Sequence, residues 1–301
     1  MRQHRPTMFP VEVFRSEASA ANLLEQVRWR ESLQCPRCQS ESVIKYGSYR
    51  EYQRYRCKNC GRTFNDKTGT IFAHAKIGLD KLLFAFYSLL RFNTSIRQVD
   101  AELDVSYRSL HQRVERFAKT LDAPHIDLVG PVEIDEFYVS AGKKGRERDR
   151  PSRSRGLSKR GRGSYDEDKP PVFVLVDRGS DQRYVIPSKS ADESTVRLLL
   201  DDHEEESLTV YTDGFRAYDP LETDETYQRE AVIHGEDEYV DGDVHVNTGE
   251  SHASLARRWL SPHRGISKDK LTAYLRLFEL RRRILRKPGR EALKEIVRTV
   301  L

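Results

Sequence analysis

The sequence from residue 245 to residue 260 reads HVNTGESHASLARRWL, a short polar turn followed by a helical pattern. Thr248 is placed to cap the first helical turn. An apolar stripe is formed by Leu255, Trp259 and Leu260. Glu250 and Arg257 are seven residues apart, nearly two helical turns, so both side chains are expected on one face. Such a pair suits a metal ion with a phosphate beside it, but an exposed helix with ordinary surface charges gives the same pattern.

Length and composition predict a multidomain protein with a buried core. The chain has 301 residues, of which 37% are hydrophobic, and this is enough for two domains or more. No run of eighteen apolar residues occurs, and no apolar stretch typical of a signal peptide follows the first residues. We therefore expect a cytoplasmic protein with no membrane partner.

Charge is distributed unevenly along the chain, although the net charge is only +5. Residues 142–164 carry ten Lys or Arg and two acidic residues, and residues 251–290 carry twelve and two. Residues 201–243 reverse this balance, with sixteen Asp or Glu and two Arg. Basic segments on either side of an acidic one are typical of a protein that binds a polyanion around a site that itself holds cations.

The four cysteines form two close pairs within the first quarter of the chain, Cys35-Pro36-Arg37-Cys38 and Cys57-Lys58-Asn59-Cys60. Their C-x2-C-x18-C-x2-C spacing predicts a structural zinc site with four thiolate ligands. Two disulfides are disfavoured by the reducing cytosol. Residues 42–56 are rich in Tyr, Val and Ile, with Gly47-Ser48 at their middle, and they predict a hairpin that turns there. We expect a zinc ribbon over residues 35–72, after an N-terminal segment, residues 1–34, with one short helix around 17–30.

Residues 78–121 have the pattern of a helix-turn-helix module. Asp80 is expected to cap a strongly apolar helix, Thr94 or Ser95 to start a second, and residues 104–106 to form a tight turn before a third. The third helix directs its apolar side chains inward. Its outward side chains, predicted to enter the major groove of DNA, are Arg108, His111, Gln112, Arg113 and Arg116. A plain three-helix bundle with a solvated basic face is the alternative.

From residue 129 the sequence predicts an α/β domain. Residues 131–139 read as a strand with acidic side chains on one face, which is unfavourable unless a metal ion compensates their charge. Residues 171–177 and 183–187 look like paired strands, a helix follows from Asp192 to about His203, and a buried strand ends at Asp213. This order predicts an RNase H-like mixed sheet, in which functional groups gather at strand ends.

The basic segment 141–169, rich in Gly and Ser, has no periodicity. We interpret it as a flexible loop that meets phosphate, with a solvated disordered loop as the alternative.

Several blocks, taken in order, resemble the zinc-ribbon DDE transposases of prokaryotic insertion sequences. The blocks are the two cysteine pairs, TGTIF at 68–72, EIDE at 133–136, TDGFRAY at 212–218, HVNTGE at 245–250 and a closing helix after Gly265. The likeness covers most of residues 30–285. It implies a zinc ribbon, a helix-turn-helix module and an RNase H-like DDE domain over residues 129–285, followed by a C-terminal tail, residues 286–301.

The resemblance also implies a catalytic set. Asp135 and Asp213 are its first two acids, and Glu250 is the third, with thirty-six residues between Asp213 and Glu250. Arg257 stands where the family more often has Lys. Asn247 is an alternative third ligand, because related members use Asn, but a carboxylate binds Mg²⁺ more strongly than an amide does. Salt bridges to the basic loop are expected to account for the neighbouring acids Glu133, Glu136 and Asp177.

The activity that the resemblance implies is DNA transposition. Such a protein binds the terminal inverted repeats, hydrolyses phosphodiesters and transfers strands, with no covalent protein–DNA intermediate. Two Mg²⁺ or Mn²⁺ ions about 4 Å apart neutralise the attacking and leaving oxygens, in addition to the structural Zn²⁺. Partners are terminal-repeat and target DNA, and a homo-oligomer is expected when two ends are bridged. The alternatives are a catalytically inactive DNA-binding regulator that uses residues 30–120 alone, and a stand-alone metal-dependent nuclease.

Overall fold

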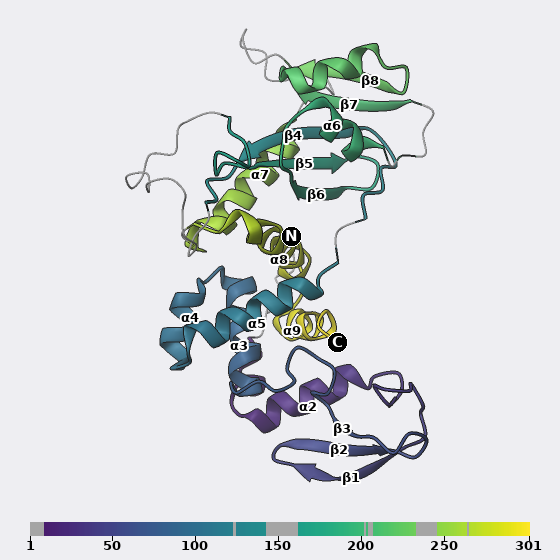
Figure 1. Cartoon of the computed structure of the whole chain (residues 1–301), viewed down its shortest axis with the longest axis vertical. Coiled ribbons are helices and arrows are strands. Elements are labelled where there is room, and N and C mark those ends of the chain that lie inside the picture. The colour runs from purple at the N-terminus through teal and green to yellow at the C-terminus, as the bar shows by residue number, and fades with distance from the viewer. Residues whose placement is uncertain are drawn as a thin grey trace, which may run out of the picture. The chain divides into compact units, whose positions relative to one another are not determined.

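The computed structural model describes residues 9–122, 125–142, 162–201, 203, 207–232, 246–263 and 265–301. The chain divides into two compact units, one of Met1–Asp122 with Leu280–Leu301 and one of Ala123–Glu279. Figure 1 shows the elements of each unit. Across the described ranges, none of the helices has both the length and the apolar character needed to span a membrane.

The ribbon in the first unit is a three-stranded antiparallel sheet in the order β1–β2–β3. Its strands are β1 Val43–Tyr49, β2 Tyr52–Cys57 and β3 Thr63–Asn65. The hairpin turns at Arg50-Glu51, since Tyr49 pairs with Tyr52, so the predicted turn at Gly47-Ser48 is wrong. Gly47 has a φ of 73° and lies where the register shifts between Lys45 and Ser48. The glycine therefore forms a bulge within β1 instead of the turn.

Helix α2, Glu17–Arg28, confirms the short helix predicted around 17–30 and follows a one-turn helix, α1, Val11–Phe14. The Ser16 side chain caps α2 by accepting a hydrogen bond from the Ser19 N–H. Directly after the helix, Trp29 packs edge-on against Tyr55 and Phe64 of the ribbon. Its indole N–H donates to the Asp66 carboxylate at 2.7 Å. This residue therefore ties the helix to the small ribbon core.

Three further helices confirm the predicted helix-turn-helix pattern, α3 Leu79–Phe92, α4 Ile96–Leu103 and α5 Tyr107–Thr120. Gly78 is the N-cap of α3, so the expected capping by Asp80 is wrong. Ser95 caps α4 in a reciprocal capping box with Gln98. Asp104, with a φ of 50°, ends α4 in the left-handed conformation and begins the tight turn to α5.

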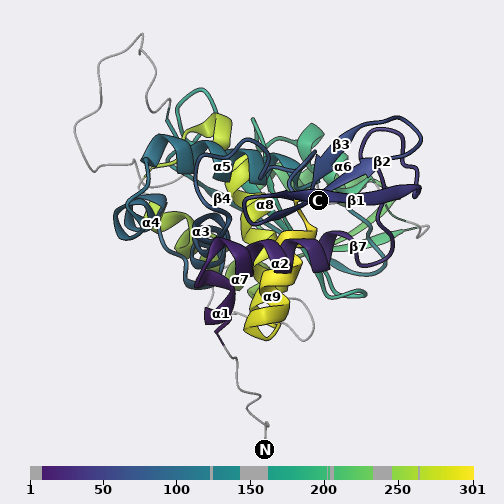
Figure 2. The same ribbon diagram turned by 90° about the horizontal axis from the view of Figure 1, so that it is seen from below.

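The C-terminal tail holds a helix that the sequence analysis did not predict, α9, Gly289–Arg298. Its buried residues are Ala292, Leu293, Ile296 and Val297, spaced so that they form one apolar face. The helix packs against α2 and α3, and Figure 2 shows α2 and α9 side by side. The preceding helix, α8, Lys268–Leu285, enters this unit at Leu280, where Arg281 donates to the Leu90 carbonyl.

The second unit contains a five-stranded mixed sheet in the order β6–β5–β4–β7–β8. Its strands are β4 Val132–Tyr138, β5 Pro171–Asp177, β6 Gln182–Pro187, β7 Leu208–Asp213 and β8 Tyr227–Val232. The β4–β5 and β5–β6 pairs are antiparallel, whereas β4–β7 and β7–β8 are parallel. The sheet confirms the predicted fold class, although β8 was not expected.

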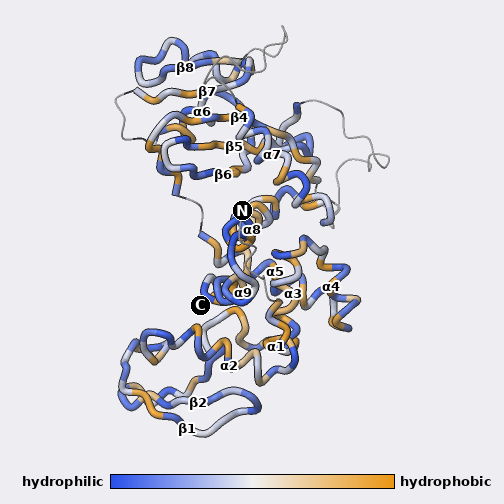
Figure 3. The backbone as a smooth tube through the Cα atoms, turned by 180° about the vertical axis from the view of Figure 1, so that it is seen from behind, coloured by the Kyte–Doolittle hydropathy of each residue, from blue (hydrophilic) through white to orange (hydrophobic). Residues whose placement is uncertain are grey.

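Helices cover both faces of this sheet. Asp192 caps α6, Glu193–Leu200, and this helix and the 3₁₀ helix η1, Arg216–Thr223, share an apolar core with one face. On the other face, α7, Asn247–Leu260, packs against β4, β5 and β6 and is followed by the short η2, Ser261–His263. All residues of β5 are buried, and Figure 3 shows its hydrophobic character. A strand covered on both faces reads as a continuous apolar run.

Candidate functional site

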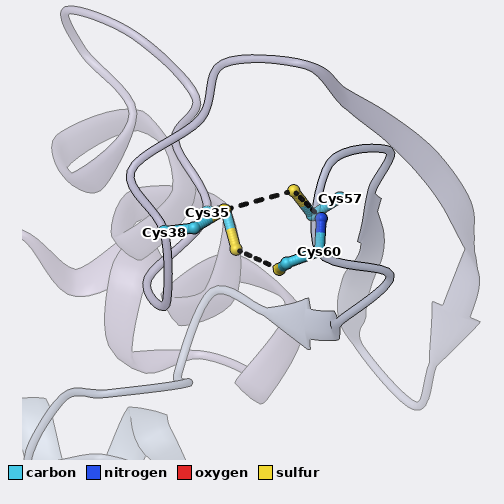
Figure 4. A group of neighbouring side chains, drawn as sticks. All are labelled: Cys35, Cys38, Cys57 and Cys60. Carbon is cyan, nitrogen blue, oxygen red and sulfur yellow. Dashed lines mark hydrogen bonds between the residues drawn. The ribbon is translucent and has the colours of Figure 1, made fainter.

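The four cysteines converge on one point of the ribbon, two from each turn (Figure 4). The Sγ atoms of Cys35 and Cys60 are 3.6 Å apart, as are those of Cys38 and Cys57, and all four lie within 4.8 Å of one another. Thiolates bound 2.3 Å from a tetrahedral zinc ion are about 3.8 Å apart. A disulfide needs about 2.05 Å, and all four cysteines are free thiols. The spacing therefore fits a closed structural zinc site.

Backbone geometry prepares one of these thiols, that of Cys57, for the metal. The backbone N–H of Cys60 donates to the Sγ of Cys57 at 3.5 Å. This hydrogen bond is the largest cause that lowers the pKa of Cys57 to about 6. The thiolate is the form that binds zinc, so Cys57 is held in its ligating form near neutral pH.

The predicted acids of the second unit lie on three different elements. Asp135 is in the middle of β4, and Asp213 is the last residue of β7, the parallel neighbour of β4. Glu250 lies in the first turn of α7. The preceding residue, Gly249, is so close to β4 that a Cβ added there would be 3.7 Å from the Cβ of Asp135. The first turn of α7 therefore crosses the strand directly above Asp135.

The electrostatics show that these acids are neighbours. The pKa of Asp135 is raised to about 6. Burial is the largest cause, and the negative charges of Asp213 and Glu250 add to it, whereas the Glu136 N–H and Arg257 oppose it. Carboxylates that share a site raise one another's pKa unless a cation balances them. Among the described residues, only the cysteines form a metal-ligand group packed within 4.8 Å, so the acids form a more open set.

Arg257 is near enough to Asp135 for its charge to lower the pKa of that acid. Its guanidinium carbon is 4.8 Å from the ring centroid of Phe137, two residues after Asp135 on β4. Both Glu250 and Arg257 are exposed. The prediction that Thr248 caps the helix is wrong. The helix begins at Asn247, its N-cap residue is Val246, and the Val246 side chain makes no capping hydrogen bond.

Asn247 is the exposed first residue of α7. Glu250, three residues later, acts electrostatically on Asp135. His245, the first residue of the quoted stretch, lies outside the described residues.

The predicted salt bridge to the basic loop is present for Glu136, whereas Glu133 and Asp177 have other partners. Glu136 forms a salt bridge with Arg162 of the basic segment at 3.4 Å. Residues 143–161 of that segment are outside the described part of the chain. Glu133 pairs with Arg178 of the β5–β6 turn at 2.9 Å. Asp177 accepts hydrogen bonds from Val129 and Gly179 N–H groups and from the Ser180 hydroxyl.

The polar face of α5 divides into two kinds of side chain. Arg108, Gln112 and Arg116 are exposed at four-residue intervals and so line one side of the helix. The Arg113 guanidinium instead donates to the carbonyls of Ile71, Ala73 and His74, at 2.5 to 3.1 Å. The His111 imidazole is half-buried, 4.0 Å from the Glu115 carboxylate. Arg113 therefore holds the 71–74 segment to α5 as a structural residue.

Two known domain families match this chain. Residues 15–63 match the transposase zinc-ribbon domain, and residues 127–282 match the ISXO2-like transposase domain. The chain belongs to the ISXO2-like transposase family. A relative of this transposase from Halobacterium salinarum (strain ATCC 700922 / JCM 11081 / NRC-1) is called "Uncharacterized protein in transposable element ISH50". The two are 66% identical over 294 residues, which cover 98% of this chain and 100% of the relative.

Solved structures with some likeness to the transposase include an intasome and a transpososome. One is a simian T-cell lymphotropic virus intasome with the PP2A regulatory subunit B56 gamma, at 10% identity and a TM-score of 0.31, covering 65% of this chain and 68% of that chain. The other is a pre-cleavage Mos1 transpososome, at 13% identity and a TM-score of 0.23, covering 70% and 76%. The family assignment rests on the domain matches and the insertion-element relative alone.

Proposed function

We propose that this protein cuts DNA at the ends of its element and joins those ends to target DNA, with Asp135, Asp213 and Glu250 as the ligands of two Mg²⁺ or Mn²⁺ ions. One observation carries the proposal. Burial raises the pKa of Asp135 to about 6, and the charges of Asp213 on β7 and Glu250 on α7 add to that rise, so acids from three elements lie near one another. Uncompensated carboxylates at one site are costly, and a divalent cation removes that cost.

The donor set fits such ions. Mg²⁺ and Mn²⁺ prefer carboxylate oxygens and retain open positions for water and phosphate. Bound ions would neutralise charge at the attacking and leaving oxygens of an in-line displacement. The protein's own residues would do the remaining work: the three acids hold that charge in place, and Arg257, fixed against Phe137, offers a guanidinium for two hydrogen bonds to a phosphate. No covalent protein–DNA intermediate is needed.

Recognition of the terminal repeats is assigned to the first unit. The exposed side of α5, with Arg108, Gln112 and Arg116, combines guanidinium groups that contact phosphates or guanine with an amide that reads adenine. The second helix of a helix-turn-helix module presents such a side to the major groove. Joining two element ends calls for at least two copies on DNA.

The deciding experiment incubates the purified full chain with labelled terminal-repeat DNA, target plasmid and Mg²⁺. Joined products support transposition. Cleavage without joining supports a metal-dependent nuclease, and retention without cleavage supports the inactive DNA-binding regulator, the runner-up. A regulator has no use for three acids gathered beside an exposed arginine, so the geometry favours the enzyme.

Asp213→Asn tests the acids directly. The Asp213 Oδ1 accepts a hydrogen bond from the Phe215 N–H at 2.9 Å, and an asparagine oxygen can accept the same bond, so the fold should persist. We expect cleavage to be abolished and terminal-repeat binding to remain. Asp181→Asn is the matched control, because Asp181 is an exposed turn residue paired with Arg183. Loss of both cleavage and binding in Asp213→Asn would show that Asp213 is structural.

A further inference from the structure

Glu133 is a buried carboxylate whose two oxygens have different partners. It lies on β4, two residues before Asp135 and on the same face of the strand, and it is 1% exposed. Its Oε1 accepts a hydrogen bond from Nε of Arg178 at 2.9 Å. Its Oε2 accepts one from the backbone N–H of Gly249, also at 2.9 Å. Each oxygen of this carboxylate therefore already has a partner within the protein.

The Gly249 contact completes the N-terminus of α7. Gly249 is the third residue of the helix, and the N–H groups of a first turn have no partner within the helix. The N-cap residue, Val246, supplies no side-chain cap. Glu133 thus acts as the cap from a different element, and its negative charge is favourable at a helix N-terminus. The residue that follows, Glu250, is the proposed third metal ligand.

Arg178 extends the connection to the remaining strand. Its guanidinium carbon lies 4.1 Å from the ring centroid of Tyr211, which is two residues before Asp213 on β7. A continuous path therefore runs from Tyr211 through Arg178 and Glu133 to Gly249. This path joins β7, β4 and α7, the three elements that carry the three acids.

We propose that Glu133 is a positioning residue that fixes Glu250 relative to Asp135 and thereby sets the affinity of the acid site for divalent cations. The inference rests on the proposed function of that site. It assigns Glu133 a role beyond the single salt bridge expected from the sequence. Glu133 binds no ion and touches no DNA; it acts through the helix.

The test compares Glu133→Ala and Glu133→Gln in the zinc-loaded full chain, with Glu193→Ala and Glu193→Gln as matched controls on the exposed start of α6. Mn²⁺ affinity is measured by titration, and hydrogen exchange is followed at residues 246–252 without Mn²⁺. We expect Glu133→Ala to weaken Mn²⁺ binding tenfold or more and to speed exchange in this turn. Glu133→Gln keeps an acceptor for the Gly249 N–H, so its loss should stay within about threefold.

Two results would overturn the inference. A folded Glu133→Ala variant with wild-type Mn²⁺ affinity would show that the helix needs no such anchor. An equal loss in Glu133→Gln and Glu133→Ala would show that Glu133 acts through its charge or as a ligand. If the wild type neither binds Mn²⁺ nor cleaves DNA, the proposed function fails, while the exchange measurement still reports separately whether Glu133 holds α7.

Arg178→Lys provides a second route if Glu133→Ala does not fold. Lysine keeps a positive charge beside Glu133 but not the planar group stacked on Tyr211. We expect about a threefold weaker Mn²⁺ affinity with unchanged binding of terminal-repeat DNA, and an unchanged Mn²⁺ affinity would contradict the proposed path.

Discussion

The cysteine site and the proposed acid site are assembled in opposite ways. The four cysteines come from one ribbon between residues 35 and 60, and two pairs of their sulfurs are already 3.6 Å apart, close to the spacing around a zinc ion. The three acids come from two strands and a helix between residues 135 and 250. Burial raises the pKa of Asp135, and the negative charges of the other two acids raise it further. Local turns thus suffice for a closed structural site, whereas the proposed catalytic site depends on sheet topology and keeps unfavourable charge.

The largest effect expected from this contrast is that of Cys57→Ser. Structural zinc contributes on the order of 10 kcal/mol or more to the folding of small domains, so one lost thiolate should release the metal and unfold the ribbon. Bound zinc per chain should fall close to zero, with faster hydrogen exchange over residues 43–65 and weaker terminal-repeat binding. Ser48→Ala, on the exposed part of β1, is the control.

The same variant separates the two sites. The acids belong to the other unit, so Mn²⁺ affinity in Cys57→Ser should match that of the wild type. Unchanged zinc content would refute the four-cysteine assignment.

A smaller effect is expected on the pH dependence of the acid-bearing unit. Burial and neighbouring charges raise the pKa of Asp135 to about 6 and that of Glu136 to about 7. A raised carboxyl pKa stabilises the fold below the unfolded value, near 4, and this stability is lost as pH rises through 6 and 7. For Asp135 the loss is about 3 kcal/mol. Without divalent ions, this unit should therefore melt at a lower temperature at pH 8 than at pH 5.

Mn²⁺ should reverse that loss at pH 8 and have little effect at pH 5, because the ion binds the deprotonated carboxylates. Asp135→Asn provides the control, since it removes one raised pKa and one ligand together. Its apo form should be more stable than the wild type at pH 8 and should respond weakly to Mn²⁺. A melting temperature independent of pH in the wild type would mean that neither burial nor neighbouring charge raises these pKa values in solution.

The sequence predicted the elements whose signals are local. The C-x2-C spacing sufficed for the ribbon, and the buried strand ending at Asp213 placed a carboxylate at a strand end, as observed. Gly47 misled the hairpin prediction because a glycine that permits a bulge looks the same in a sequence as one that permits a turn. Strand β8, with the sequence YQREAV, lacks the alternation that marks a strand and is held by its parallel pairing with β7.

Other features depend on partners distant in the chain. The role of Glu133 requires Gly249, 116 residues later, and no local pattern connects them. The structural use of Arg113 was hidden for the same reason, since its acceptors at residues 71–74 precede α5. In the sequence alone, an outward-facing arginine on a helix is interpreted as a DNA contact. Only the structure shows that another segment of the chain accepts its hydrogen bonds. By contrast, the apolar spacing in α9 is a local signal that is visible in the sequence.

The smallest effects are expected on α5, where Arg113 and Arg116 give a matched pair. Arg113→Ala removes three hydrogen bonds to carbonyls and should lower the free energy of unfolding of the first unit by about 1–3 kcal/mol. Arg116→Ala, at an exposed position, should leave that stability within about 0.5 kcal/mol. It should instead weaken terminal-repeat binding by about 1 kcal/mol and reduce the salt dependence of binding by about one phosphate contact.

The pair distinguishes folding from recognition within one helix. The Arg113 guanidinium is hydrogen-bonded to carbonyls of residues 71–74, so any loss of DNA binding in Arg113→Ala should be proportional to the fraction of unfolded protein. That loss should disappear when both variants are compared well below their melting temperatures. Arg116→Ala should keep its binding defect under those conditions. If instead Arg113→Ala weakens binding at full stability while Arg116→Ala binds as the wild type does, the DNA-facing side of α5 is the one that carries Arg113, and the assignment of Arg108, Gln112 and Arg116 must be abandoned.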